Sequence, residues 1–165
     1  MIEAKMILTV DNFMQGFDIH YKYKNRSLKV LSGIGIFMIF MSILGVFNFG
    51  LSAVLPTLLP GIFLATISLI IKYFTKRNLK KLPTLGQEMT YQLDELEMSG
   101  TAVDFDFSQK WKSMFDALIA EHGILVYPQK NAFYWLPKSA FSSENDFHQV
   151  VEYVQNGVPR YKVVK

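Results

Sequence analysis

The sequence contains no cysteine, and one long stretch of it contains no charge. Without cysteine, neither a disulfide framework nor a thiolate metal or redox site can form. Val30 to Ile71 holds 42 residues without a single Asp, Glu, Lys, Arg or His. A chain of 165 residues has too small an interior to bury such a stretch. The missing charge therefore favours a membrane location over a buried core hairpin in a soluble protein.

The uncharged stretch is twice as long as one membrane crossing requires. As a single helix it would extend about 63 Å, whereas a bilayer has a hydrocarbon core about 30 Å thick that roughly 20 residues can cross. Residues 48–50 interrupt the stretch, and Pro56 and Pro60 follow. We predict a hairpin of two transmembrane helices within 30–71, Val30–Phe47 and about Leu51–Ile71. The first span begins too late for a secretory signal and is expected to stay in the mature protein.

The net charge of +3 is unevenly distributed. Residues 82–165 carry seven Lys/Arg against eleven Asp/Glu, which argues against a nucleic-acid partner. Basic residues flank both spans, and none lies between them. The positive-inside rule therefore predicts a multi-pass protein of the cell membrane with both termini cytoplasmic. Within a basic linker at 72–82, the cations expected to orient the hairpin and contact anionic lipid headgroups are Lys72, Lys76, Arg77, Lys80 and Lys81.

Residues 1–29 predict a separate N-terminal segment with a short strand and a helix. Met6–Val10 alternates weakly between apolar and polar residues. Asp11 can cap a helix in which Phe13, Phe17 and Tyr21 recur every four residues. Aromatic residues mixed with cations at its end suit a headgroup region. Two interpretations stay open: an amphipathic helix at the membrane surface, or the first turns of the first span.

Residues 83–165 predict a cytoplasmic domain of five to seven short antiparallel strands closed by one helix. Glu88–Leu93 alternates, Ser99-Gly100 indicates a hairpin turn, and Val103–Phe107 alternates as a half-buried strand. Residues 111–118 have apolar side chains at helical spacing, but the segment can equally open as a turn and pass into a strand.

The end of the chain predicts two more strands and the closing helix. Ile124–Tyr127 and Ala132–Leu136 are strand candidates joined by a turn at residues 129–131. Ser143 and Asp146 have the spacing of a capping box. The helix that follows ends near Gly157 and Pro159. Its apolar stripe consists of Phe147, Val150, Val151 and Val154.

The order of these elements, together with three short motifs, resembles the YcxB-like membrane proteins of bacteria. The motifs are Thr9-Val10-Asp11, Trp111 with Met114, and the run Tyr-Trp-Leu-Pro-Lys-Ser-Ala-Phe at 134–141. The resemblance implies a membrane α-hairpin followed by an α+β domain similar to bacterial pleckstrin-homology-like (PH-like) domains. Such a domain has a bent antiparallel sheet with a C-terminal helix plugging one end. The family offers no established activity to carry over.

No motif in the sequence points to catalysis, and we expect no enzyme, no cofactor and no metal. The three histidines lack ligand spacing, and the glycines do not form a phosphate loop. Asp104 and Asp106 lie two apart on a predicted strand and are expected to face solvent. The residues that suggest a ligand groove or interaction site are Trp135, Pro137 and Lys138. Their alternative role is to dock a sheet edge onto the last helix.

Two classes of function fit these observations. In the first, the hairpin anchors an interaction or sensing module whose partners are membrane lipids and another protein. In the second, the chain is a small membrane immunity or accessory protein whose hairpin binds another membrane protein or a toxin. The contact surface would then include Gly33, Gly35, Gly45, Gly61 and Ala65. Because the tail is acidic, it is not expected to bind phosphoinositides tightly by itself.

Overall fold

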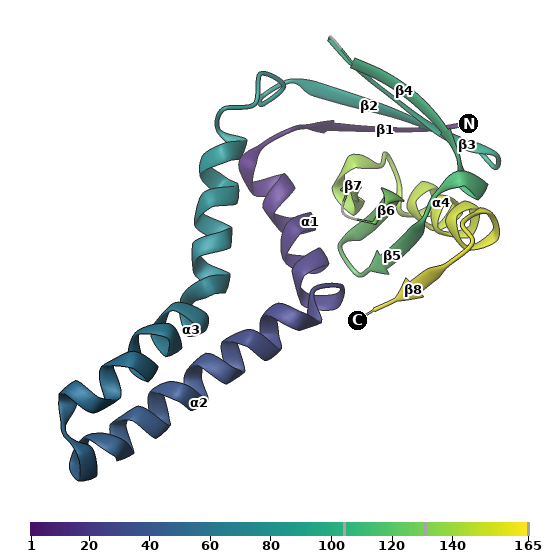
Figure 1. Ribbon diagram of the computed structural model, residues 1–165. Helices are drawn as coiled ribbons and strands as arrows, with labels where there is room; N and C mark the ends of the chain where they lie inside the picture. The colour runs from purple at the N-terminus through teal and green to yellow at the C-terminus, as the bar shows by residue number, and fades with distance from the viewer. Residues whose placement is uncertain (104, 131, 165) are drawn as a thin grey trace. The chain divides into compact units, whose positions relative to one another are not determined.

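The computed structural model describes residues 1–103, 105–130 and 132–164, which form two compact units (Figure 1). One unit consists of residues 20–81, and the other combines residues 1–19 with residues 82–165. The helix α1, Val10–Tyr23, contributes to both.

The unit of residues 20–81 is a helical hairpin. Its helices α2, Arg26–Phe49, and α3, Leu51–Leu79, are joined at Gly50, whose φ of +78° is accessible to glycine without strain. This confirms the two predicted helices. Both extend further at their outer ends than predicted, and Pro56 and Pro60 lie inside α3, as they do in the predicted second span.

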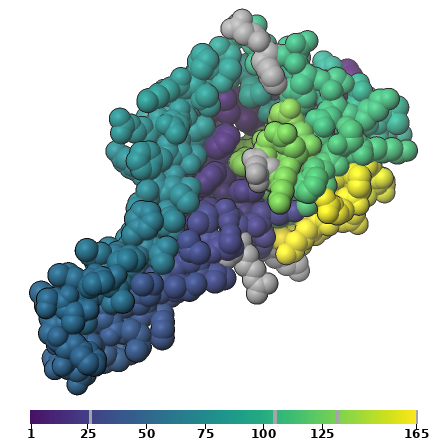
Figure 2. All heavy atoms as spheres, in the orientation of Figure 1, coloured from purple at the N-terminus to yellow at the C-terminus, as the bar shows by residue number. Residues whose placement is uncertain are grey.

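Both helices are long and apolar enough to cross a membrane, and their apolar side chains are uncovered. Only 11% of the most apolar window of each helix is buried. Phe37, Phe47 and Leu59 are 62%, 85% and 62% exposed, and the turn end is visible in dark blue in Figure 2. The helices are therefore not a buried core hairpin, because most of their apolar side chains are exposed.

Small residues bring α2 and α3 into backbone contact. A Cβ at Gly35 would lie 2.4 Å from the backbone nitrogen of Ala65 and 2.7 Å from the carbonyl oxygen of Gly61. Further along, the hydroxyl oxygens of Ser42 and Thr57 are 2.9 Å apart and share a hydrogen bond. The pair Gly61 and Ala65 is thus used inside the hairpin.

The other unit combines strands from both sides of the hairpin. β1, Ile2–Ile7, pairs antiparallel with β2, Glu88–Leu93 (Figure 1). Alternate residues of β1 are buried, with Ala4 fully so. The strand expected at Met6–Val10 thus lies earlier, and the domain expected at 83–165 also includes residues 1–19. Three alternating apolar residues are a weak signal, and the partner strand is remote in sequence.

Two four-stranded sheets enclose the core. The first has the order β1-β2-β3-β4 with only antiparallel pairs; β3 is Glu97–Ala102 and β4 is Phe105–Lys110. The second has the order β7-β6-β5-β8. Its strands are β5, Asp116–Ala120; β6, Gly123–Gln129; β7, Ala132–Pro137; and β8, Tyr161–Val163. β8 was not predicted, and it pairs parallel to β5.

The turn between β2 and β3 lies earlier than predicted. Ser99-Gly100 is inside β3, and Asp94 makes the turn by accepting hydrogen bonds from the backbone N–H groups of Leu96 and Glu97. Gly100 is opposite Phe107, and a Cβ there would lie 2.3 Å from the Phe107 ring. The glycine therefore accommodates an aromatic ring rather than a turn. Val103 is in the turn before β4, and Asp104 lies outside the described residues.

The segment after β4 is not a helix but a turn that passes into a strand, which was the second of the two predicted alternatives. Trp111–Ser113 forms a single 3₁₀ turn and the chain then enters β5. Trp111 is fully buried, and its indole Nε1–H donates to the carbonyl oxygen of Asp94 at 2.8 Å.

The closing helix α4, Glu144–Gly157, confirms the prediction from its cap and stripe. The side chain of Ser143 accepts a hydrogen bond from the backbone N–H of Asp146 at 3.1 Å. Val150 and Val154 are fully buried in the core between the sheets, whereas Val151 is half-buried at its edge. The stripe is thus narrower than predicted.

The helix α1 is separate from the first span. The hydroxyl of Thr9, not Asp11, accepts the hydrogen bond from the N–H of Asn12 at 3.1 Å, and α1 ends before Lys24-Asn25. The apolar residue Phe13, expected to face the membrane, packs against Phe133 of β7 with ring centroids 5.5 Å apart. The interpretation of α1 as the first turns of α2 is therefore wrong.

Candidate functional site

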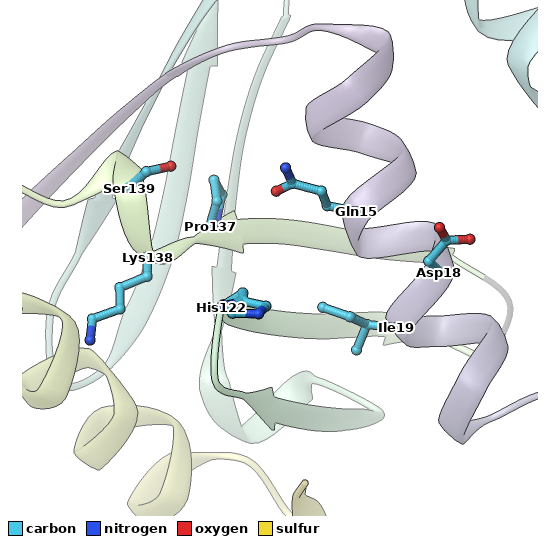
Figure 3. A pocket seen from close by; sticks show the side chains of 7 residues that line it. All are labelled: Gln15, Asp18, Ile19, His122, Pro137, Lys138 and Ser139. Atoms are coloured by element: carbon cyan, nitrogen blue, oxygen red, sulfur yellow. The ribbon is translucent and has the colours of Figure 1, made fainter. Parts of the chain in front are cut away.

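A hollow of about 720 Å³ lies between α1 and the end of β7 (Figure 3). Three α1 residues at i, i+3 and i+4 form one wall: Gln15, Asp18 and Ile19. The facing wall is the turn before β6 and the 3₁₀ turn Lys138–Ala140 that follows β7. The backbone N–H of Lys138 donates to the carbonyl oxygen of His122 at 2.9 Å, which holds these two segments together.

The hollow combines several polar groups on a partly apolar surface. Figure 3 shows Ile19 extending from α1 toward His122, and Gln15 lying over Pro137. Asp18 and Ser139 complete the lining with a carboxylate and a hydroxyl. Such a surface can hydrogen-bond an amide-rich or hydroxyl-bearing partner, which is the pattern of a binding site.

Lys138 is engaged by the closing helix. Its Nζ donates to Oε1 of Glu144 at the start of α4 and lies 5.7 Å from the centre of the Phe147 ring. The hydrogen bond from Lys138 and the positive charge of Lys138 lower the pKa of the Glu144 carboxyl below its ordinary value. The side chain turns away from α1 (Figure 3), so Lys138 lines the hollow and also connects β7 to α4.

Trp135 is separated from Pro137 and Lys138, the two other residues predicted for this site. It is 3% exposed, on the face of β7 that α1 covers, and does not line the hollow. Gly16 of α1 approaches it so closely that a Cβ would lie 2.8 Å from the indole ring, and a Cβ at Gly123 of β6 would lie 2.5 Å from the far edge of that ring. The structure therefore brings Pro137 and Lys138 to the hollow and places Trp135 in a packed layer beneath α1.

Most residues that line the hollow were not among the predicted site residues. Gln15, Asp18, Ile19 and His122 come from segments with no shared motif, and Ser139 lies in the motif at 134–141 but was not selected as a site residue. The spacing of the three α1 residues was a usable signal for one helix face, but only the folded unit brings that face to β7.

The predicted headgroup cations lie at the C-terminal end of the hairpin. Lys72, Lys76 and Arg77 are in the last turns of α3, and Lys80 and Lys81 follow directly. Nine of the 17 Lys/Arg residues and none of the 14 Asp/Glu residues lie in residues 20–81. The other unit therefore keeps eight cations against 14 acidic residues, so the two units carry opposite net charges.

Among the described residues, no cluster of three or more His, Asp or Glu side chains could hold a metal ion. No family model, curated protein or solved structure matches the chain.

Proposed function

We propose that the protein is an integral membrane protein in which the hairpin α2–α3 anchors a folded interaction or sensing domain. The observation that carries this proposal is the pairing of β1 with β2 on either side of the hairpin. Strands of one sheet must share one compartment, so a hairpin inserted between them leaves and re-enters on the same side. Two crossings satisfy that requirement, whereas a single crossing does not.

The charge distribution supports a cytoplasmic position for the folded domain. The cations of residues 20–81 lie outside the uncharged stretch, which the positive-inside rule associates with the cytoplasmic face. Each cation near an anionic surface is worth about 1 kcal/mol. The acidic folded unit would be repelled from the same surface, so it is suited to a protein partner rather than to lipid headgroups.

We further propose that the folded unit is a PH-like domain, as the resemblance to YcxB-like proteins implies. Its support is the order of the strands: a four-stranded antiparallel meander, a second antiparallel meander of β5, β6 and β7, and then α4 in the core. In this proposal the hairpin is an insertion between the first two strands of the domain.

The topology can be tested by single-cysteine labelling, because the natural chain has no cysteine. Asn48→Cys reports on the hairpin turn, and Glu3→Cys and Ser142→Cys report on the folded unit; all three positions are exposed. A membrane-impermeant maleimide should label Asn48→Cys in intact cells and the other two only after lysis. Labelling of Glu3→Cys and Ser142→Cys from opposite sides would contradict the proposal.

The hollow beside α1 is the recognition surface that we propose for the partner. Ser139→Trp would fill the hollow, and Ser142→Trp places the same side chain at an exposed serine outside its lining. Copurification from native membranes should lose the partner only with Ser139→Trp. Loss with both variants, or with neither, would count against the hollow.

The alternative in which the hairpin itself binds a membrane protein or toxin has less support. Gly35, Gly45 and Gly61 are close to the opposite helix of the same hairpin, whereas Gly33 has no neighbour within 4 Å beyond its own helix. Most of the small residues are thus already used within the hairpin. A chain truncated after Lys81 that kept full function would nevertheless favour this alternative.

A further inference from the structure

A second, smaller cavity lies at the seam between the two sheets. β1 and β7 are edge strands of different sheets, and the cavity of about 150 Å³ lies between β1–β2 and β7. Phe13 of α1 and Leu82 complete its wall. The cavity is separate from the hollow of Figure 3, and the two share no lining residue.

The cavity is deep at one end and open at the other. Met6, Tyr91 and Trp135 are 7%, 2% and 3% exposed, whereas Leu82 is 44% exposed. Leu82 therefore marks the open side of the cavity.

The lining favours an aromatic occupant. Five of the nine lining residues are aromatic, and two more are methionines, whose sulfur atoms pack well against ring edges. An apolar cavity of about 150 Å³ is large enough to hold a benzene-sized ring.

The cavity wall also contains donors that the chain satisfies poorly. The indole Nε1–H of Trp135 is buried and has no hydrogen-bond partner among the described residues. The hydroxyl of Tyr91 donates only to the sulfur of Met89, at 3.8 Å, which is a weak acceptor. An unpaired buried donor is unfavourable, so an occupant that supplies an oxygen acceptor would bind better than one of equal size without it.

We propose that this cavity binds a single aromatic ring carrying a carbonyl oxygen, with Trp135 Nε1–H as the donor to that oxygen. The ring fits the aromatic and thioether walls, and the carbonyl supplies the missing acceptor. Two sources share this chemistry: a dissolved aromatic ketone, and the ring of a quinone held in the bilayer.

The test uses the full chain in lipid nanodiscs with ¹⁵N-labelled tryptophan. The protein has two tryptophans, and Trp111 Nε1–H is already bonded to Asp94, so its signal is an internal reference. Acetophenone should move the Trp135 indole signal downfield in a saturable manner without moving that of Trp111. Ethylbenzene has the same size without the oxygen and should bind roughly five- to tenfold more weakly.

Two variants distinguish the Trp135 donor from the Tyr91 donor, and a second ligand distinguishes a dissolved ketone from a quinone in the bilayer. Trp135→Phe keeps a ring and should make acetophenone and ethylbenzene bind equally, measured by isothermal titration calorimetry against empty nanodiscs because this variant has no Trp135 signal. By the same measurement, Tyr91→Phe should preserve the difference. A decyl-substituted benzoquinone in the nanodisc lipids tests the bilayer source; a response to either ligand supports the proposal. It is overturned if neither ligand moves the Trp135 signal, or if Tyr91→Phe rather than Trp135→Phe abolishes the difference.

Discussion

Removing β1 should unfold the domain, although β1 precedes the hairpin and the other strands follow it. Ile2 and Met6 are 8% and 7% exposed in the core. Burial of an isoleucine or methionine side chain is worth about 1.5–3 kcal/mol, so the two contribute about 3–6 kcal/mol. A small domain has a total stability of about 5–15 kcal/mol. A fragment of residues 83–165 should therefore be unfolded or close to unfolding.

The matched protein keeps β1 and omits the membrane hairpin. It joins residues 1–19 to residues 82–165 through about 20 Gly/Ser residues, which span about 25 Å on average. Urea denaturation followed by circular dichroism should show a cooperative transition for this protein and none for the fragment. An equal denaturation midpoint for the two would refute the role assigned to β1.

A pair of substitutions tests the register of β1 in the same background. Ala4 is fully buried and Ile7 is 54% exposed. Ala4→Asp puts an unpaired carboxylate in the core and should lower the free energy of unfolding by several kcal/mol. Ile7→Asp introduces the same group on the solvent side and should change it by less than about 1 kcal/mol. Equal losses would contradict the register.

The other predictions concern α4, the β2–β3 turn and the hairpin. Val154→Asp should cost several kcal/mol of unfolding free energy and Val151→Asp clearly less, measured by urea denaturation, because only Val154 is fully buried. Asp94→Ala removes two hydrogen bonds to backbone N–H groups and should cost about 1 kcal/mol at pH 7. Those bonds lower the pKa of the Asp94 carboxyl below its ordinary value of 3.8, so denaturation midpoints of wild type and variant should converge as pH falls through the lowered pKa. Gly35→Leu should separate α2 from α3 and increase proteolysis of the hairpin, whereas Gly33→Leu, in open space, should not.

The sequence was most informative where one physical requirement acts locally. An uncharged run of 42 residues with a break at Gly50 predicts two apolar helices without knowledge of any other residue. The cap at Ser143 and the stripe that begins at Phe147 predicted α4 for a similar reason, because both signals lie within a few turns of one helix.

Tertiary structure decided everything that depends on residues distant in sequence. The alternation of Ile2, Ala4 and Met6 is too short to identify a strand, and β2 gives it a partner only after the whole hairpin has been crossed. In the sequence of α1 alone, Gly16 does not indicate any contact. In the folded unit it allows α1 to lie directly on Trp135.

The candidate sites follow the same division. Trp135, Pro137 and Lys138 were predicted as one site because they are close in sequence. Trp135 lies within β7, beneath α1 and in the wall of the small cavity, whereas Pro137 ends β7 and, with Lys138, lines the hollow. The sequence by itself determined that there is an uncharged hairpin and an acidic remainder. Only folding decided which side chains share a cavity, because that depends on strand pairing between segments on both sides of the hairpin.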